Sequence, residues 1–169
     1  DPNDPQSTPT KRTALGRVKH EGATVTESRG RVVVYTGDDE NCDYLYKFVG
    51  DRSWRRHIAR HRSPLDHGTL YVAQFNDDGS GSWLPLAHGV GPLTTAAGWV
   101  DQADVLIRTR MAADAVGATR LHRPEWVSVD EHTGDVYVTL TNGTGNSNAT
   151  NGFRDPDPYG QVVRFRHDH

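Results

Sequence analysis

The chain has 169 residues, of which 34% are hydrophobic and 24% are charged, and its formal net charge is −3. This length suits one domain of ordinary size, and the nearly balanced charge gives no reason to expect nucleic-acid binding. No apolar run is long enough to cross a membrane, since a spanning helix needs about 20 such residues. A mean hydropathy of −0.71 indicates a hydrophobic core that is small for a chain of this length.

The order of predicted elements is that of a β-rich domain with one helical insertion. Residues 1–14 are polar and rich in proline, as in a flexible or linker segment, so the domain is expected to cover residues 15–169. One helix is expected at 101–116, closed by Gly117, with an apolar stripe of Ala103, Leu106, Ile107, Met111 and Val116. Short strands bounded by turn residues are predicted at 31–36, 44–49, 69–75, 82–86, 126–129, 136–141 and 162–166.

Two local features carry alternatives. Residues 51–63, DRSWRRHIARHRS, concentrate arginine and histidine. A solvated surface loop is the plainer interpretation of such a run, and a helix that presents a basic face to an anion is the other.

The single cysteine, Cys42, has no partner for an internal disulfide. We expect it to be partly buried and structural, with metal ligation as the alternative.

An internal repeat relates two parts of the chain. Residues 21–38 align without gaps on residues 125–142, which places Glu21 on Glu125, Gly30 on Gly134 and Val34 on Val138. Each copy reads as a carboxylate, a short strand, a glycine turn and a valine-rich strand. Repeated antiparallel units of this kind are the signature of a β-propeller. The sequence therefore predicts a β-propeller fragment of about two blades, which cannot close a propeller alone.

The repeat also singles out the residues that precede its first strands. In a propeller, a residue just before an innermost strand points at the mouth of the central channel, so Glu21 and Glu125 are expected to converge there. Two converging carboxylates repel unless a cation or a proton lies between them, and hard cations prefer such oxygen ligands. Arg123 would add a planar fork suited to phosphate. The alternative is that both glutamates cap turns or pair with nearby arginines.

Several long motifs, in order, resemble the PhoX-type bacterial alkaline phosphatases. They include KHEGA around Glu21, GTLYVAQF at 68–75, RPEWVSVDEHTGDVYVTLTN at 123–142 and DPYGQVVRF at 157–165. The resemblance runs from about Leu15 to Phe165. Because that family is longer than this chain, it implies that the chain is a central fragment.

The resemblance implies a phosphatase that hydrolyses phosphate monoesters at an Fe³⁺ and Ca²⁺ site on the propeller axis. It assigns metal ligation to Glu21 and Glu125, and phosphate contact and catalysis to Arg123. The family's iron-ligating cysteine lies upstream of KHEGA, whereas Cys42 lies downstream of it, so Cys42 is not assigned to iron. Further ligands are expected elsewhere in the parent chain, which is needed to close the propeller. The isolated fragment is therefore expected to be inactive.

Two other functions stay open from the sequence. A calcium-dependent, lactonase-like propeller hydrolase would also place a glutamate before a strand, but it would not need Arg123 beside the metal. A non-catalytic propeller scaffold would leave Glu21 and Glu125 with structural roles. The family resemblance implies a periplasmic or secreted protein, although this chain shows no signal peptide.

Overall fold

The computed structural model describes residues 3–149 and 152–166. Within them, the α-helices are α1 (Trp54–Ile58), α2 (Gln102–Ile107) and α3 (Thr109–Val116), and short 3₁₀ helices lie at Thr13–Leu15 and Thr95–Ala97. The strands are β1 (His20–Ser28), β2 (Arg31–Asp38), β3 (Asn41–Asp43), β4 (Leu45–Ser53), β5 (Gly68–Phe75), β6 (Gly81–Pro85), β7 (Leu121–His122), β8 (Pro124–Val129), β9 (Asp135–Leu140) and β10 (Gln161–Arg166). Each individually predicted strand is present, so the expectation of a mainly β structure is confirmed.

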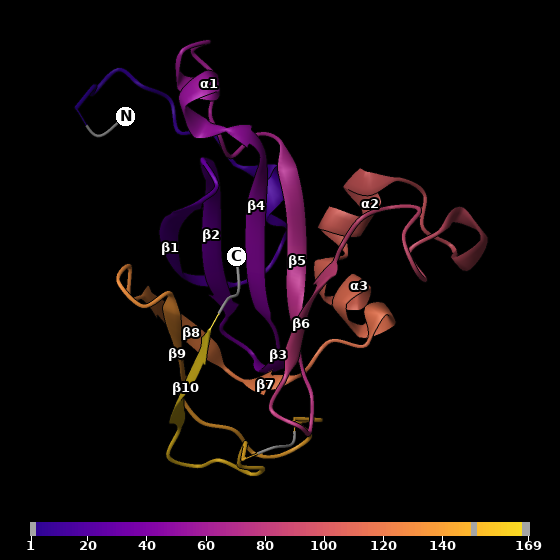
Figure 1. Ribbon diagram of the computed structural model, residues 1–169. Coiled ribbons are helices and arrows are strands. Elements are labelled where there is room, and N and C mark those ends of the chain that lie inside the picture. Colours follow the sequence, from indigo (N-terminus) through magenta and orange to yellow (C-terminus); the bar gives the residue numbers. More distant parts are fainter. Residues whose placement is uncertain (1–2, 150–151, 167–169) are drawn as a thin grey trace.

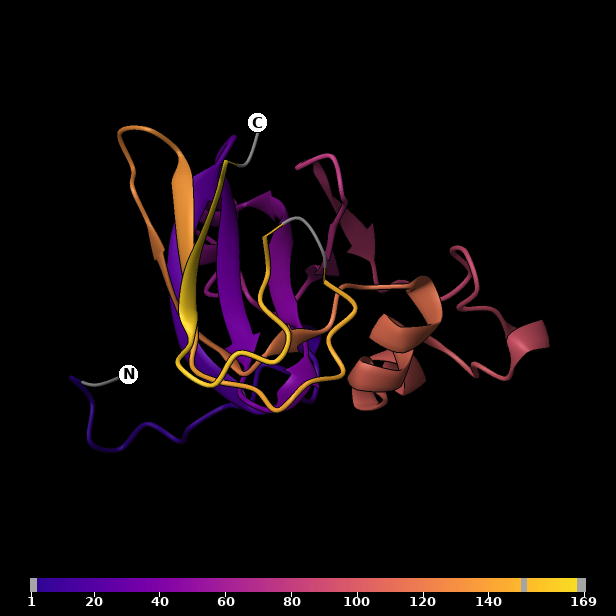
Figure 2. The ribbon, with the colours of Figure 1, turned by 90° about the horizontal axis from the view of Figure 1, so that it is seen from below.

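The strands form antiparallel sheets (Figure 1). A five-stranded sheet has the order β1-β2-β4-β5-β6, a three-stranded sheet has the order β10-β9-β8, and β3 pairs with β7. Figure 2 shows α2 and α3 on one side of the larger sheet and the smaller sheet on the other side. The larger sheet is therefore the middle layer.

Strand β2 explains why this sheet can be covered on both faces. Successive strand residues point to opposite faces, and β2 is apolar on both. Val32 and Val34 pack in the core on the helical side, whereas Val33 and Tyr35 pack in the core shared with the smaller sheet. A half-exposed strand would alternate apolar and polar residues, so the continuous apolar run matches a fully buried strand.

The predicted helix at 101–116 is wrong in one respect, because it is broken at Arg108, which has φ −98° and ψ 41°. The carbonyl of Leu106 accepts a hydrogen bond from the backbone N–H of Arg17 at 2.9 Å. The Thr109 hydroxyl also donates to it at 2.6 Å. The break changes which side chains are buried: Met111 and Ile107, both placed in the predicted stripe, are 54% and 56% exposed. The buried positions are Val105, Thr109, Ala112 and Ala113.

The repeat is present as two hairpins, but its predicted register is wrong. Val34 pairs with Val25 in the first hairpin, whereas Val138 pairs with Val127, not Val129, in the second. The second hairpin has a longer turn, with the N–H of Asp130 bonded to the carbonyl of Asp135 at 2.8 Å. The valines of β2 and β9 are buried in both hairpins, but Val25 of β1 is 60% exposed whereas Val127 of β8 is buried. The two-blade propeller fragment stays a prediction.

Residues 3–12 precede the first helical turn and contain neither helix nor strand. The division into a linker at 1–14 and a domain at 15–169 stays a prediction, and residues 1–2, 150–151 and 167–169 lie outside the described part. In the described residues, no helix is both long and apolar enough to span a membrane.

Candidate functional site

Strands β1 and β8 bring the two predicted glutamates to one end of β2. Glu21 pairs with Gly37 of β2, and Gly37 in turn touches the backbone of β8: a Cβ added at Gly37 would lie 2.0 Å from the carbonyl oxygen of Pro124. Next to Glu21, a Cβ added at Gly22 would lie 3.1 Å from the ring of Trp126. The segments that carry Glu21 and Glu125 are therefore neighbours, as expected.

Arg123 lies between β7 and β8 in a left-handed backbone conformation, with φ 47°. Its Nε and Nη2 donate to the two carboxylate oxygens of Asp39 at 2.8 and 3.1 Å, and Nη2 also donates to Oε1 of Glu125 at 3.2 Å. The hydrogen bond to Asp39 is the main cause of a raised pKa for Arg123. Nη1 has no hydrogen-bond partner among the described residues, so it is available to donate a hydrogen bond to an anion.

The two glutamates differ in their surroundings. Oε1 of Glu125 accepts hydrogen bonds from the Thr141 hydroxyl and from Arg123, and the side chain is 21% exposed. Within the described part of the chain, the carboxylate of Glu21 makes no hydrogen bond or ion pair. Glu125 is thus held in place from two sides, and Glu21 keeps its oxygens available for a ligand.

A second ion-pair cluster lies beside this site and supports the end of β2. Asp38 is fully buried, and its carboxylate accepts from Nε and Nη2 of Arg110 at 2.7 and 2.5 Å and from the N–H of Lys19 at 3.0 Å. Arg110 also lies 3.3 Å from Asp43. Burial, followed by the charge of Asp38, raises the pKa of Asp43 to about 6. This pairing fixes the chain that carries Asp39.

Sequence reasoning missed four contributors to this site. Nothing in the sequence indicates that Asp39 holds Arg123. Thr141, Arg110 and Gly37 were not singled out at all. A run of carboxylates directly after a buried strand, GDDE at 37–40, was the available signal for Asp38 and Asp39.

The histidines next to the candidate residues do not contact them. His122 is buried, and its ring nitrogens face Asn41 Oδ1 at 3.1 Å and Asp155 Oδ1 at 2.8 Å. His20 lies against Thr36 and the carbonyl of Gly16. Both histidines brace the chain around the site.

Cys42 is partly buried, and its Sγ lies 3.1 Å from the carbonyl oxygen of Gly145. Burial raises the pKa of its thiol. The predicted partial burial of Cys42 is therefore confirmed, and its structural role stays a prediction.

The carboxylate oxygens of Glu21 and Glu125 fit a hard cation such as Ca²⁺ or Fe³⁺ by their chemistry. The described residues nevertheless hold no group of three or more His, Cys, Asp or Glu side chains placed to bind a metal. A metal site here would need ligands in addition to these two.

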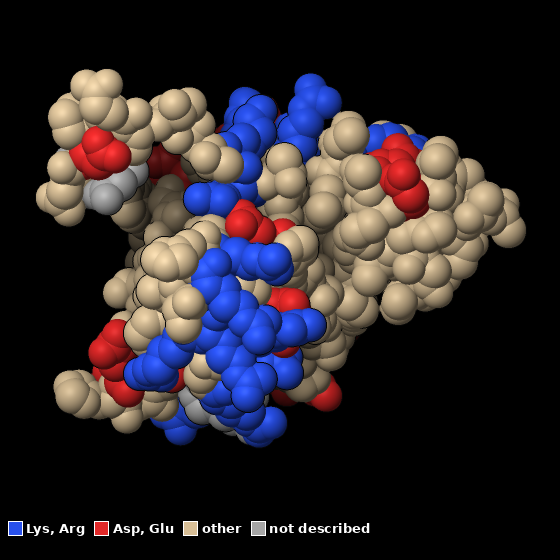
Figure 3. All heavy atoms as spheres, turned by 90° about the horizontal axis from the view of Figure 1, so that it is seen from above, with Lys and Arg blue, Asp and Glu red and all other residues tan. Residues whose placement is uncertain are grey.

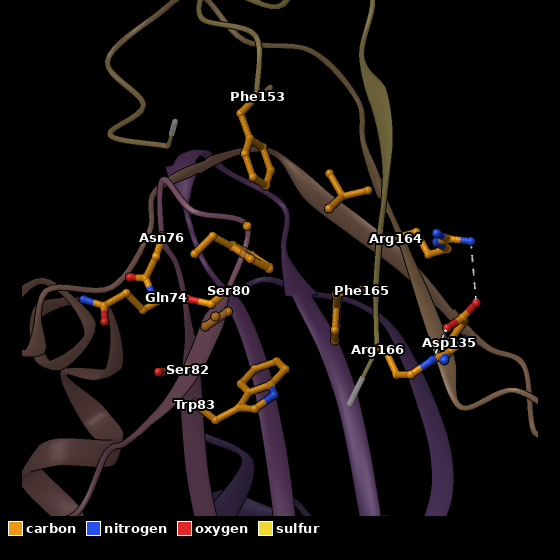
Figure 4. Close-up of a pocket in the computed structure, with 15 residues that line it drawn as sticks. Gln74, Asn76, Ser80, Ser82, Trp83, Asp135, Phe153, Arg164, Phe165 and Arg166 are labelled. Atoms are coloured by element: carbon orange, nitrogen blue, oxygen red, sulfur yellow. Dashed lines mark hydrogen bonds and ion pairs between the residues drawn. The ribbon is translucent and has the colours of Figure 1, made fainter. Parts of the chain in front are cut away.

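A hollow of about 810 Å³ lies elsewhere, between the β5–β6 hairpin and β10 (Figure 4). Its floor is aromatic, with the ring of Phe165 5.9 Å from those of Phe75 and Trp83. These rings belong to the core between the two sheets, and none of the predicted site residues lines the hollow. We interpret it as the place where the two sheets diverge.

The comparisons with known proteins agree with the motifs around this site. The family model of alkaline phosphatase PhoX matches residues 1–169. This chain belongs to the PhoX alkaline phosphatase family. No curated protein sequence matches it.

A solved structure of Pseudomonas fluorescens PhoX, in complex with vanadate as a transition state analogue, is 46% identical and superposes with a TM-score of 0.87. The match covers 99% of this chain and 32% of that one, so the chain spans about a third of the length of this relative. The arrangement of Arg123 and the two glutamates therefore belongs to a part of a PhoX fold.

Proposed function

We propose that the full-length protein is a metal-dependent alkaline phosphatase that hydrolyses phosphate monoesters, with Glu21, Glu125 and Arg123 in its active site. The observation that carries this proposal is how the guanidinium of Arg123 is held. Asp39 fixes its plane through two hydrogen bonds, Glu125 accepts one from Nη2, and Nη1 is left available to an anion. Membership of the PhoX family and the vanadate complex of the relative support phosphoryl transfer as the reaction.

In this proposal, Glu21 and Glu125 hold Ca²⁺ and Fe³⁺ together with ligands from the rest of the protein. Such cations, when bound, act as Lewis acids toward the phosphoryl oxygens. Thr141 holds the carboxylate of Glu125 in one orientation. The side chain of Glu125 therefore loses little rotamer freedom when it binds a metal. The edge strands β1 and β8 would then line the axis of a propeller to which the two sheets contribute blades.

Arg123 would stabilise the negative charge that spreads over the equatorial phosphoryl oxygens in the transition state. Its position depends on Asp39, since a bidentate pair fixes both the distance and the plane of the guanidinium. Asp39 is a positioning residue in this scheme. We also propose a periplasmic or secreted location, in line with the family resemblance of the sequence.

The test is hydrolysis of a chromogenic phosphomonoester by the full-length protein, compared with its Glu125→Gln variant. We expect the variant to lose more than about 10²-fold in turnover, because even indirect support of metal ligands is worth 10–100-fold. Metal content, measured by mass spectrometry, should fall with it. Glu131→Gln, an exposed glutamate in the β8–β9 turn, is the matched control.

Full activity in Glu125→Gln would place the chemistry elsewhere in the protein. A parent that hydrolyses lactones and not phosphate esters would support the lactonase-like alternative. A parent that binds no metal and hydrolyses neither would support the scaffold.

A further inference from the structure

The end of the molecule that carries α1 is strongly basic, and the site described above does not use it. Figure 3 views this end and shows Lys and Arg side chains gathered over it. The backbone N–H of Trp54, at the start of α1, bonds to the carbonyl of Gly30 at 3.0 Å, which brings the arginines of the β1–β2 turn alongside. The arginines of the α1 segment are Arg52, Arg55, Arg56, Arg60 and Arg62.

The turn after α1 directs these arginines toward one another. His61 has φ 53°, and two hydrogen bonds close the helix: His61 N–H to the Ile58 carbonyl at 2.9 Å, and Arg62 N–H to the His57 carbonyl at 3.0 Å. This is the Schellman pattern of helix termination. It brings the chain back, so that Arg62 lies on the same side as the helix. The resulting hollow of about 260 Å³ is lined by Arg52, Arg56, His57, Arg60, Arg62 and His67.

The acidic side chains near this hollow already have partners. Asp51, which also lines it, lies 2.9 Å from Nε2 of the buried His57 and 3.5 Å from Arg52. Glu27 accepts from the Trp54 indole and lies 3.7 Å from Arg55.

Asp66, the remaining carboxylate of this segment, bonds to Arg12 at 2.5 Å. Three arginines that line the hollow have no acidic partner among the described residues: Arg56, Arg60 and Arg62. Three neighbouring guanidinium groups repel one another, and a bound anion would relieve this repulsion.

We propose that this hollow is an anion-binding site for a small phosphate-bearing molecule, either inorganic phosphate or the phosphate group of a small ester. Guanidinium groups bind phosphate through paired N–H···O bonds, and several of them converge here. The hollow is slightly smaller than the usual range of small-molecule pockets, about 300–1,000 Å³, which favours a compact anion over a large ligand.

This site is separate from the proposed active site. Strand β2 begins at Arg31, which pairs with Ser53 immediately before α1, and it ends at Asp38, next to Asp39 and Arg123. A strand of that length spans roughly 23 Å at about 3.3 Å per residue. The two sites therefore lie at opposite ends of β2, and binding at one does not require the other.

Calorimetric titration of the full-length protein with inorganic phosphate tests this proposal. We expect one class of binding site to persist at 150 mM salt in the wild type and in an Arg123→Gln variant. In the double variant Arg60→Gln/Arg62→Gln, affinity at this class should fall by at least about tenfold, given the strength of hydrogen bonds to charged groups, while phosphatase turnover at saturating substrate stays unchanged.

Arg164→Gln, which removes another exposed arginine, is the control and should keep the wild-type isotherm. A parallel titration with phenylphosphonate, a non-hydrolysable ester mimic, distinguishes the two sources: binding of phosphate alone assigns the free anion, and binding of both assigns esters as well. An unchanged isotherm in the double variant, or binding lost at 150 mM salt, would overturn the proposal in favour of a solvated basic surface.

Discussion

Replacement of Gly37 by alanine tests the close contact between β2 and β8 on which the proposed site depends. The added Cβ would lie 2.0 Å from the carbonyl oxygen of Pro124 and 2.6 Å from that of Glu125, whereas such atoms do not approach within 3.0 Å. Both obstacles are backbone atoms, so no side-chain rotation relieves the clash. The two strands must separate by at least about 1 Å, and Glu125 and Arg123 move with β8.

The separation should affect both stability and activity. Overpacking typically costs about 1–3 kcal/mol, and each kcal/mol lowers the melting temperature by about 2–4 °C in a protein domain of this size. A displacement of about 1 Å in a catalytic group can reduce the rate about 10²-fold. We therefore expect Gly37→Ala in the full-length protein to melt several degrees lower and to lose about 10²-fold in kcat/KM when assayed well below its melting temperature.

Gly81→Ala provides the matched control. Gly81 is also a strand glycine, and its added Cβ would lie 3.1 Å from the nearest atom, the carbonyl oxygen of Gln74. It lies in β6, away from the site, and we expect near wild-type activity from it. If Gly37→Ala retained wild-type kcat/KM and melting temperature, β8 could not be pressed against β2 as described, and the proposed geometry would be refuted.

Three further predictions concern the ion pairs around the site. Arg123→Lys keeps the charge but loses the two-point contact with Asp39, so kcat/KM should fall about 10²–10³-fold with little change in melting temperature, as steady-state kinetics and thermal melts would show. Arg110→Met leaves the buried carboxylate of Asp38 without its cation and should cost about 3–5 kcal/mol of unfolding free energy in denaturant titrations; adding Asp38→Asn should restore most of it, and a single variant as stable as the wild type would contradict the pairing. Because the folded protein raises the pKa of Asp43 from 3.8 to about 6, the folded state holds its proton more tightly, and the contribution of Asp43 to stability declines as the pH rises through that window. Melting temperatures of Asp43→Asn should therefore match the wild type best near pH 4 and exceed it most near pH 7, and a difference independent of pH would rule out this linkage.

The strands could be predicted because each is a short apolar run between turn residues. The break at Arg108 could not, because it depends on a distant segment: the N–H of Arg17 takes the carbonyl of Leu106. Helical periodicity describes local preference only, so it placed Met111 in the core where the structure exposes it. The register of the second hairpin was missed for a similar reason, since the length of its turn is set by hydrogen bonds of Asp130 that the alignment of valines does not reveal.

The equivalent places of Glu21 and Glu125 in the repeat predicted that the segments that carry them are neighbours, as β1 and β8 are. The role of Asp39 could not be predicted, because a carboxylate at a strand end is equally suited to a turn, a cation or an arginine. Only the fold shows that β3 and β7 pair beside it and deliver Arg123 to that position. The role of Gly37 could not be predicted for another reason, since a glycine in a strand does not indicate which backbone segment packs against it.

The left-handed backbone of Arg123 has a consequence for the evolution of this site. A residue with a Cβ is about 1–2 kcal/mol less stable in that conformation than in the right-handed one, and glycine bears almost none of this strain. Substitution of Arg123 by glycine should therefore relax the chain while it removes the guanidinium. Selection for stability alone would favour the substitution, so in the proposed active site an arginine at φ 47° is a position where function and stability are in conflict.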